Sequence, residues 1–212
     1  MTGVDTVKIC GLTRPDNALD CARAGADMIG MVFFEKSPRN VTLDQAREIC
    51  RALPDHVTAC GVFVDEPFAR IMAIAQECGL GGVQLHGGEP PALVERLSAE
   101  GLVVIKAFFA ARRPDLSMAE HYGAADFCLA EYGKGDLPGG NAESWNYGLA
   151  AGVNQSLMLA GGLTPENVGT AIIQASPDAV DASSGVESAP GIKDINRVTA
   201  FVSAAKHPQD TG

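Results

Sequence analysis

Short apolar runs recur along the chain and predict eight β-strands. They occupy residues 7–12, 27–34, 57–64, 82–88, 102–109, 126–130, 157–162 and 179–185. Their being apolar on both faces is typical of parallel strands covered by helices. The segments between them carry apolar residues at helical spacing, and several begin with Pro and an acidic residue and end at Gly. The pattern predicts an α/β fold.

The strand–helix alternation and the chain length together predict a single (β/α)8 TIM barrel. Eight such units within 212 residues fit a compact barrel better than an open, doubly wound sheet. The helix expected in the sixth unit, near residues 145–153, is short and contains two glycines. We therefore predict one barrel domain over residues 1–212, in which only the tail 207–212 frays.

Charge and composition narrow the classes of function. The formal net charge of −10 argues against binding to nucleic acid or to an anionic membrane surface, since both require clustered basic side chains. No apolar run approaches the roughly 18 residues of a membrane span, and no signal peptide is evident. The six cysteines show neither C-x-x-C nor close pairing, which argues against a zinc site. We expect a cytoplasmic protein with reduced thiols and no bound metal. With 6% aromatic residues and no obvious interface, we also expect a monomer.

Active sites of such barrels lie at the carboxyl ends of the strands, so polar residues there are candidates. Lys8 and Cys10 alternate onto one face of the first strand, where the ammonium would favour a reactive thiolate. A buried, inert cysteine is an equally good interpretation. Arg39, after the second strand, suits a carboxylate or phosphate but also fits a solvated surface charge. Gln84 and His86 share a face of the fourth strand, where a lone histidine is more often structural than catalytic.

Small residues follow the last two strands and predict a phosphate site. The loop after the seventh strand contains Gly161 and Gly162, and the loop after the eighth contains Ser183, Ser184 and Gly185. These two loops commonly bind phosphate in this architecture, because small residues let backbone N–H groups approach the oxygens. Tight turns alone could explain one such loop, but two favour a phosphorylated small-molecule substrate.

Seven motifs together resemble one enzyme family. They are VKICGLT, GADMIGMVFFEKSPR, VQLHGGE, VIKAF, LPGGN, LAGGLTPENV and VDASSGVESAPGIKD. Between residues 7 and 201 the chain resembles phosphoribosylanthranilate isomerase of tryptophan biosynthesis. The resemblance implies a cofactor-free barrel that converts N-(5-phosphoribosyl)anthranilate into 1-(2-carboxyphenylamino)-1-deoxyribulose 5-phosphate by an Amadori rearrangement.

The resemblance also implies roles for individual residues. Cys10 matches the general base, Arg39 matches the arginine that holds the anthranilate carboxylate, and His86 matches a histidine lining the site. Lys8 and Gln84 lie beside these matched positions and are further candidates for substrate binding. The residues matching the phosphate loops are Gly161, Gly162, Ser183, Ser184 and Gly185.

The sixth unit departs from the family pattern at the strand end and again downstream, at Asn141-Ala142 and at Trp145-Asn146-Tyr147. The family's general acid is an Asp at the end of the sixth strand, and alignment backwards from the glycines of residues 133–140 places Ala130 there. Alanine cannot donate a proton. Glu131 is the nearest replacement, but alternation puts it on the face opposite to Cys128 and Ala130, so a bulge or an early strand end would be needed to turn it inward. Asp136 in the following loop is a second candidate.

Four interpretations follow from this departure. The chain is a working isomerase in which Glu131, Asp136 or the substrate's own carboxylate supplies the proton. Alternatively, it is a divergent paralogue that acts on another phosphorylated small molecule, an isomerase engineered at Ala130, or a barrel that binds its ligand without catalysis. The first is our prediction.

Overall fold

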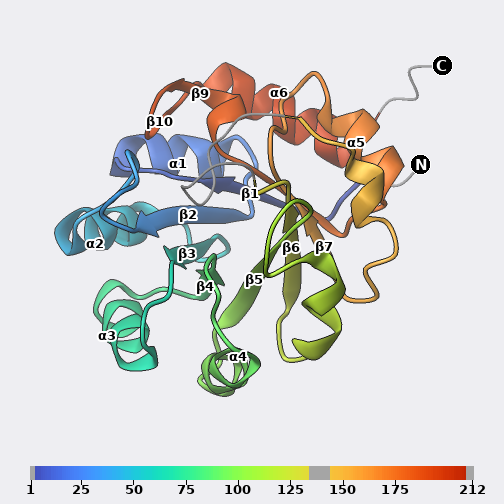
Figure 1. The fold of residues 1–212 in the computed structure, drawn as a ribbon. Coiled ribbons are helices and arrows are strands. Elements are labelled where there is room, and N and C mark those ends of the chain that lie inside the picture. Colours follow the sequence, from blue (N-terminus) through green and yellow to red (C-terminus); the bar gives the residue numbers. More distant parts are fainter. Residues whose placement is uncertain (1–2, 134–143, 209–212) are drawn as a thin grey trace.

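Eight parallel strands close into a barrel in the order of the sequence (Figure 1). The chain is seen in a computed structural model that describes residues 3–133 and 144–208. The strands are β1 Thr6–Cys10, β2 Met28–Phe33, β3 Thr58–Phe63, β4 Gly82–Leu85, β5 Val103–Phe109, β6 Phe127–Glu131, β7 Leu157–Leu159 and β8 Ala179–Ala182. The predicted (β/α)8 barrel is confirmed.

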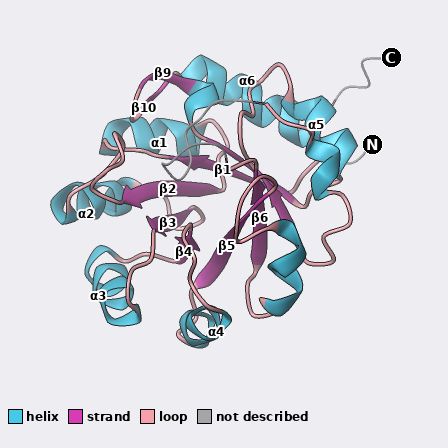
Figure 2. Cartoon of the chain, viewed as in Figure 1, coloured by secondary structure: helices cyan, strands magenta, loops and turns pink. Residues whose placement is uncertain are grey.

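Helices surround the barrel on its outside (Figure 2). The α-helices are α1 Pro15–Arg23, α2 Leu43–Ala52, α3 Phe68–Cys78, α4 Pro91–Ala99, α5 Val168–Ala175 and α6 Ile195–Lys206. Short 3₁₀ helices stand in the fifth and sixth units, η1 Leu116–His121 and η2 Tyr147–Ala150. The weak sixth helix is therefore confirmed as a single short turn, in keeping with the poor helix propensity of its glycines.

Local sequence signals define the helix ends. Pro15 and Pro91 occupy the first turns of α1 and α4, where the missing N–H has no helical partner to lose. Thr42 caps α2 in a reciprocal capping box with Gln45. Helix α3 ends at Gly79, whose φ of 74° lies in the left-handed region that glycine adopts without strain.

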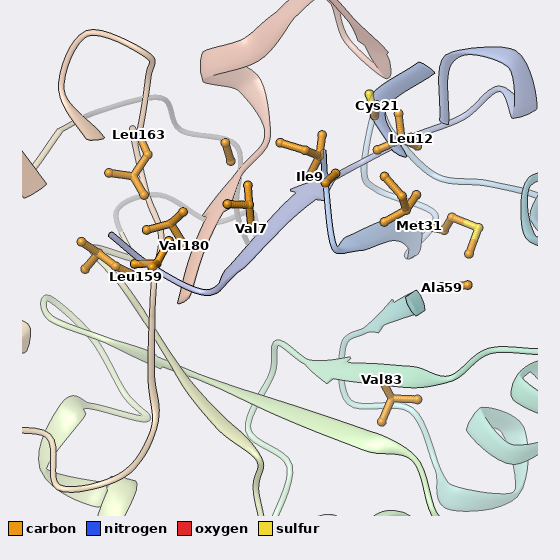
Figure 3. Close-up of a cluster of buried hydrophobic side chains, with 14 of the residues drawn as sticks. Val7, Ile9, Leu12, Cys21, Met31, Ala59, Val83, Leu159, Leu163 and Val180 are labelled. Atoms are coloured by element: carbon orange, nitrogen blue, oxygen red, sulfur yellow. The ribbon is translucent and has the colours of Figure 1, made fainter. Parts of the chain in front are cut away.

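Side chains of the strands alternate between two apolar layers. The outer layer packs strand residues such as Val7, Ile9 and Met31 against the helices (Figure 3). The second cluster consists only of residues on the strands or directly after them, and it fills the barrel. Its members are Met28, Cys60, Ile105, Ala107, Phe109, Leu129, Met158, Ala160 and Ala179. Because side chains alternate between these two layers along each strand, the layers show which strand-end residues face the mouth.

A short hairpin follows β8 and lies close to the mouth of the barrel. The turn η3 Ser184–Val186 leads into β9 Glu187–Ala189, which pairs antiparallel with β10 Ile192–Lys193. Of the sequence predictions, Asp136 and tail residues 209–212 lie outside the described residues. Within the described ranges, no helix is long and apolar enough to cross a membrane.

Candidate active site

A buried ion pair lies beneath Cys10. Lys8 of β1 is in register with Asp181 of β8, and its Nζ donates a hydrogen bond of 2.9 Å to Asp181 Oδ1. Burial acts to lower the pKa of Lys8, but the Asp181 carboxylate and the neighbouring Cys10 and Cys60 together outweigh it and hold that pKa above its usual range. Lys8 is therefore a fixed positive charge below the mouth.

Cys10 is the last residue of β1 and is 7% exposed. A Cβ added to Gly30 would lie 2.7 Å from Cys10 Sγ, so the glycine of β2 leaves the space that the thiol occupies. Burial raises the pKa of the Cys10 thiol, and the ammonium groups of Lys8 and Lys193 only partly oppose this. The site thus holds a thiol beside two cations.

Three charged side chains form a network at the β1–β8 side of the mouth. Arg39 donates from Nε and Nη2 to the two carboxylate oxygens of Glu187, at 2.8 and 2.6 Å. Lys193 Nζ lies 2.7 Å from Glu187 Oε1 and donates to the carbonyl oxygen of Ser183 at 3.2 Å. Burial alone would raise the pKa of Glu187, but its bonds to the two cations lower that pKa to about 2. Arg39 is therefore not a solvated surface charge.

Glu131, the last residue of β6, points into the barrel mouth. Its Oε2 lies 3.2 Å from His86 Nε2, and both side chains are more than nine-tenths buried. The contact is close but not aligned as a hydrogen bond. On the other side of the ring, His86 Nδ1 lies 2.8 Å from Gln84 Nε2. The structure thus brings Gln84, His86 and Glu131 together.

This orientation corrects the sequence interpretation of β6. Ala130 and Cys128 belong to the outer layer against the helices, whereas Leu129 belongs to the cluster inside the barrel. Strands β5 and β6 pair in continuous register up to Phe109 and Glu131, so Glu131 faces inward without a bulge. The face shared by Cys128 and Ala130 was wrongly taken as the face of the site. The alanine lies outside the site, and a carboxylate lies inside it.

The lysine of the VIKAF motif fixes the loop that carries His86. Lys106 faces outward from β5, and its Nζ donates to the Gly87 carbonyl at 2.8 Å and lies 3.1 Å from Glu89 Oε2. Glu89 in turn accepts from the backbone N–H of Gly87 and of Asp65. This motif therefore acts structurally, by holding the loop directly after His86.

The two predicted phosphate loops pack against each other. A Cβ on Gly185 would lie 1.9 Å from the carbonyl oxygen of Leu163, so only glycine permits the contact. Gly161 and Gly162 have φ values of 86° and 65°, in the left-handed region. Among the described residues, neither N–H of these two glycines donates to a protein acceptor. Both donors are thus available to an anion.

Two aromatic residues hold the loop after β7 from behind. Trp145 Nε1 donates to the Ala160 carbonyl at 3.0 Å, and the Tyr147 hydroxyl donates to the Gly161 carbonyl at 3.0 Å. These bonds fix carbonyls next to the two N–H groups that have no acceptor in the described part of the chain. Sequence reasoning noted the altered residues 145–147 but missed this role, because the motif is separated from its partners by a whole β/α unit.

A cavity of about 570 Å³ opens beside His86, at the ends of β2 to β5. The apolar lining consists of Phe34, Val64, Met118 and Tyr122, and the charged lining of Asp65, Arg112 and Arg113. The Arg112 guanidinium stacks 3.5 Å from the centroid of the Phe109 ring. A concave cavity with a partly apolar lining and a few charged groups is typical of small-molecule sites.

Sequence reasoning missed three charged residues of the site. These are Asp181, Glu187 and Lys193. Asp181 lies within the apolar run of β8, and a carboxylate at such a position was a usable signal for a partner on a neighbouring strand. In the described part of the chain, no group of three His, Cys, Asp or Glu could hold a metal ion.

Comparisons with known proteins agree on one family. A family model described as N-(5'phosphoribosyl)anthranilate (PRA) isomerase matches residues 7–204. The N-(5'-phosphoribosyl)anthranilate isomerase of Desulfatibacillum aliphaticivorans is 49% identical over 201 residues, which cover 94% of this chain and 92% of that protein.

Solved structures show the same similarity. Phosphoribosyl anthranilate isomerase from Thermotoga maritima superposes with a TM-score of 0.86 at 38% identity, over 95% of this chain and 98% of that one. A phosphoribosyl anthranilate isomerase in complex with reduced 1-(o-carboxyphenylamino)-1-deoxyribulose 5-phosphate gives a TM-score of 0.83 at 38% identity, with the same coverage. The family model spans residues 7–204, and each of these structures covers 95% of this chain. The chain belongs to the N-(5'-phosphoribosyl)anthranilate isomerase family.

Proposed function

We propose that this protein isomerises N-(5'-phosphoribosyl)anthranilate to 1-(2-carboxyphenylamino)-1-deoxyribulose 5-phosphate. The observation that carries the proposal is the pair formed by Cys10 and Glu131. Each is the last residue of its strand and faces the mouth, on β1 and β6. The phosphate loops after β7 and β8 lie between these two strands in the closed barrel. A sugar phosphate held there would have one proton-transfer group on either side.

The reaction requires two proton transfers, and the site offers a group for each. Glu131 protonates the furanose ring oxygen, and the bond from C1 to that oxygen breaks to leave a protonated Schiff base. The Cys10 thiolate then removes the proton from C2, which gives the enolamine. Protonation at C1 and loss of the proton on the C2 oxygen produce the ketone. No atom is gained or lost, so the reaction is an internal rearrangement.

The other residues bind the substrate. The loops containing Gly161, Gly162, Ser183, Ser184 and Gly185 receive the phosphate, since two of their N–H groups have no protein acceptor among the described residues. Arg39 receives the aromatic carboxylate with the N–H donors that Glu187 leaves free. His86 and Gln84 orient Glu131, and Lys8 stabilises the thiolate of Cys10 from below.

The alternatives to a working isomerase lose their main support. A paralogue, an engineered trap and a binding-only barrel were each inferred from a missing general acid at Ala130. Because Ala130 packs against the helices and Glu131 faces His86, the site contains a carboxylate that can supply the proton. Asp136 is not needed for that role.

Complementation tests the proposal directly. The gene is expressed in a tryptophan auxotroph that lacks only the isomerase, alongside variants Cys10→Ser and Glu131→Gln and a matched surface control, Glu77→Gln. We expect growth with the wild type and the control, and impaired growth with the two site variants. No growth with a soluble, folded wild-type protein would refute the proposed reaction.

The predictions of a monomer and of a cytoplasmic location remain proposals. All six cysteines are free thiols, which suits a reducing compartment. In residues 3–133 and 144–208, only three large apolar side chains are exposed, and these are Leu149, Ile173 and Ile192. Light scattering coupled to gel filtration measures the mass in solution, and a mass twice that of the chain would overturn the monomer.

A further inference from the structure

The hairpin β9–β10 contributes two charged residues that the proposed reaction leaves without a role. Glu187 begins β9 and Lys193 ends β10. The exposed fractions of their side chains are 6% and 0%. Burying two charged groups is costly unless they are paired and hydrogen-bonded. Charged side chains that only keep a protein soluble are exposed, so these two buried groups at the mouth require another explanation.

Glu187 saturates its carboxylate with donors. Its Oε1 accepts from Arg39 Nε at 2.8 Å, from Lys193 Nζ at 2.7 Å and from the Gly191 N–H at 3.0 Å. Its Oε2 accepts from Arg39 Nη2 at 2.6 Å. Two parallel bonds to a planar guanidinium fix both its position and its plane. A guanidinium carries five N–H donors, and three of them, including both on Nη1, have no acceptor among the described residues and remain for a ligand.

The same carboxylate connects Arg39 to the rest of the site. A Cβ on Gly11 would lie 2.6 Å from Arg39 Cδ and 3.1 Å from Ser183 Oγ, so the arginine stem passes between the β1 loop and a phosphate loop. Lys193 donates to the Ser183 carbonyl at 3.2 Å. Glu187 therefore joins the carboxylate-binding arginine and the phosphate loop into one rigid unit beside Cys10.

We propose that Glu187 is a positioning residue for the isomerase, which holds Arg39 in place and is the counter-ion of Lys193 at the mouth of the barrel. The inference rests on the proposed function and deepens it. Long side chains lose much rotamer freedom when a ligand immobilises them. With Arg39 fixed beforehand, the substrate does not bear that cost, and binding improves.

Geometry also allows the opposite role, in which Glu187 competes with the substrate carboxylate for Arg39. The two roles predict opposite effects of removing the charge. A positioning carboxylate lowers KM, so its loss raises KM. A competing carboxylate raises KM, so its loss lowers KM. A merely structural residue changes thermal stability and leaves both KM and kcat unaltered.

Steady-state kinetics of Glu187→Gln and Glu187→Asp, with Glu77→Gln as control, decide among these. Glu77 also pairs with an arginine, Arg47, but at the exposed outer surface. We expect Glu187→Gln to raise KM about 10- to 100-fold, with a smaller change in kcat. A change of this size corresponds to the loss of one or two hydrogen bonds to a charged group. Glu187→Asp keeps the charge and should give an intermediate KM. A lower or unchanged KM in Glu187→Gln overturns the proposal.

A second measurement does not require the substrate. Alkylation of Cys10 by iodoacetamide is followed against pH by mass spectrometry of its peptide, with the buried Cys60 as an internal check that the barrel stays folded. Lys193 is also held by Ser183, so in Glu187→Gln its charge stays near Cys10 without its counter-ion. We expect the midpoint of alkylation to fall by at least about half a pH unit. An unchanged midpoint overturns the proposed link from Glu187 through Lys193 to Cys10. This outcome does not depend on whether the protein is the isomerase.

Discussion

Glu131→Gln separates the proton-donating role of Glu131 from its shape. Glutamine preserves the volume of the side chain and its contact with His86 Nε2, 3.2 Å away, but it cannot serve as a general acid. Loss of a general acid typically costs about 10²- to 10⁴-fold in rate, which corresponds to roughly 3 to 5 kcal/mol of transition-state stabilisation. We expect kcat to fall within that range and KM to change less than about threefold.

The measurement is initial-rate kinetics of purified protein, followed on the aromatic amine of the substrate. Circular dichroism and thermal melting of the same sample show whether the fold is intact. Glu131→Asp keeps a carboxylic acid but shortens the side chain by one methylene. Its kcat should therefore lie between those of the wild type and Glu131→Gln. A Glu131→Gln protein that keeps its fold and loses less than about tenfold in kcat would refute the assignment of the acid.

Ala130→Asp tests the orientation of β6. Ala130 is fully buried in the layer between barrel and helices, so an aspartate there would be a buried charge without a partner. We expect a destabilisation of about 3 kcal/mol or more. In the Glu131→Gln background the new aspartate should restore no activity. Recovery of kcat in that double variant would show that residue 130 faces the site.

Three further predictions follow from the site. Gly185→Ala should lower the melting temperature and raise KM at least tenfold, since its Cβ would lie 1.9 Å from the Leu163 oxygen and force the two loops apart. Inhibition of the variant by inorganic phosphate as strong as that of the wild type would contradict this. Because burial holds the pKa of Cys10 above its usual range, kcat/KM measured against pH should still be rising where an ordinary thiol is half ionised, and a plateau at neutral pH would contradict the thiolate as base. The pKa of Glu187 is about 2 in the fold, down from 4.5, so its ion pairs stabilise the fold above pH 4.5 and lose that effect as pH falls towards 2. Urea unfolding at neutral pH should show the wild type more stable than Glu187→Gln by about 2 kcal/mol. The same difference in unfolding free energy near pH 2 would refute the link between this carboxylate and stability.

Local patterns in the sequence were sufficient for the architecture. Eight apolar runs, each followed by a helical segment or a short turn, leave little choice once parallel strands must be covered on their outer face. The sequence also predicts the phosphate loops, because glycine and serine after the last two strands let backbone N–H groups approach an anion. The motif order then supported the family, which the comparisons establish over residues 7–204.

The face of each strand-end residue could not be read with the same certainty. Alternation tells which residues share a face, but not which of the two faces is the inside of the barrel when both are apolar. In β6 both Leu129 and Ala130 are fully buried, one inside the barrel and one against the helices. The error about Ala130 came from this ambiguity, and it made a carboxylate seem absent.

The sequence by itself determined the barrel and predicted the phosphate loops and Cys10 as a candidate base, since each depends on residues close together in the chain. Only the tertiary structure decided that Glu131 meets His86, that Asp181 neutralises Lys8, and that Glu187 holds Arg39. These pairs join residues that lie 45, 173 and 148 positions apart. The closure of the barrel brings them together, and no local propensity encodes such a distance.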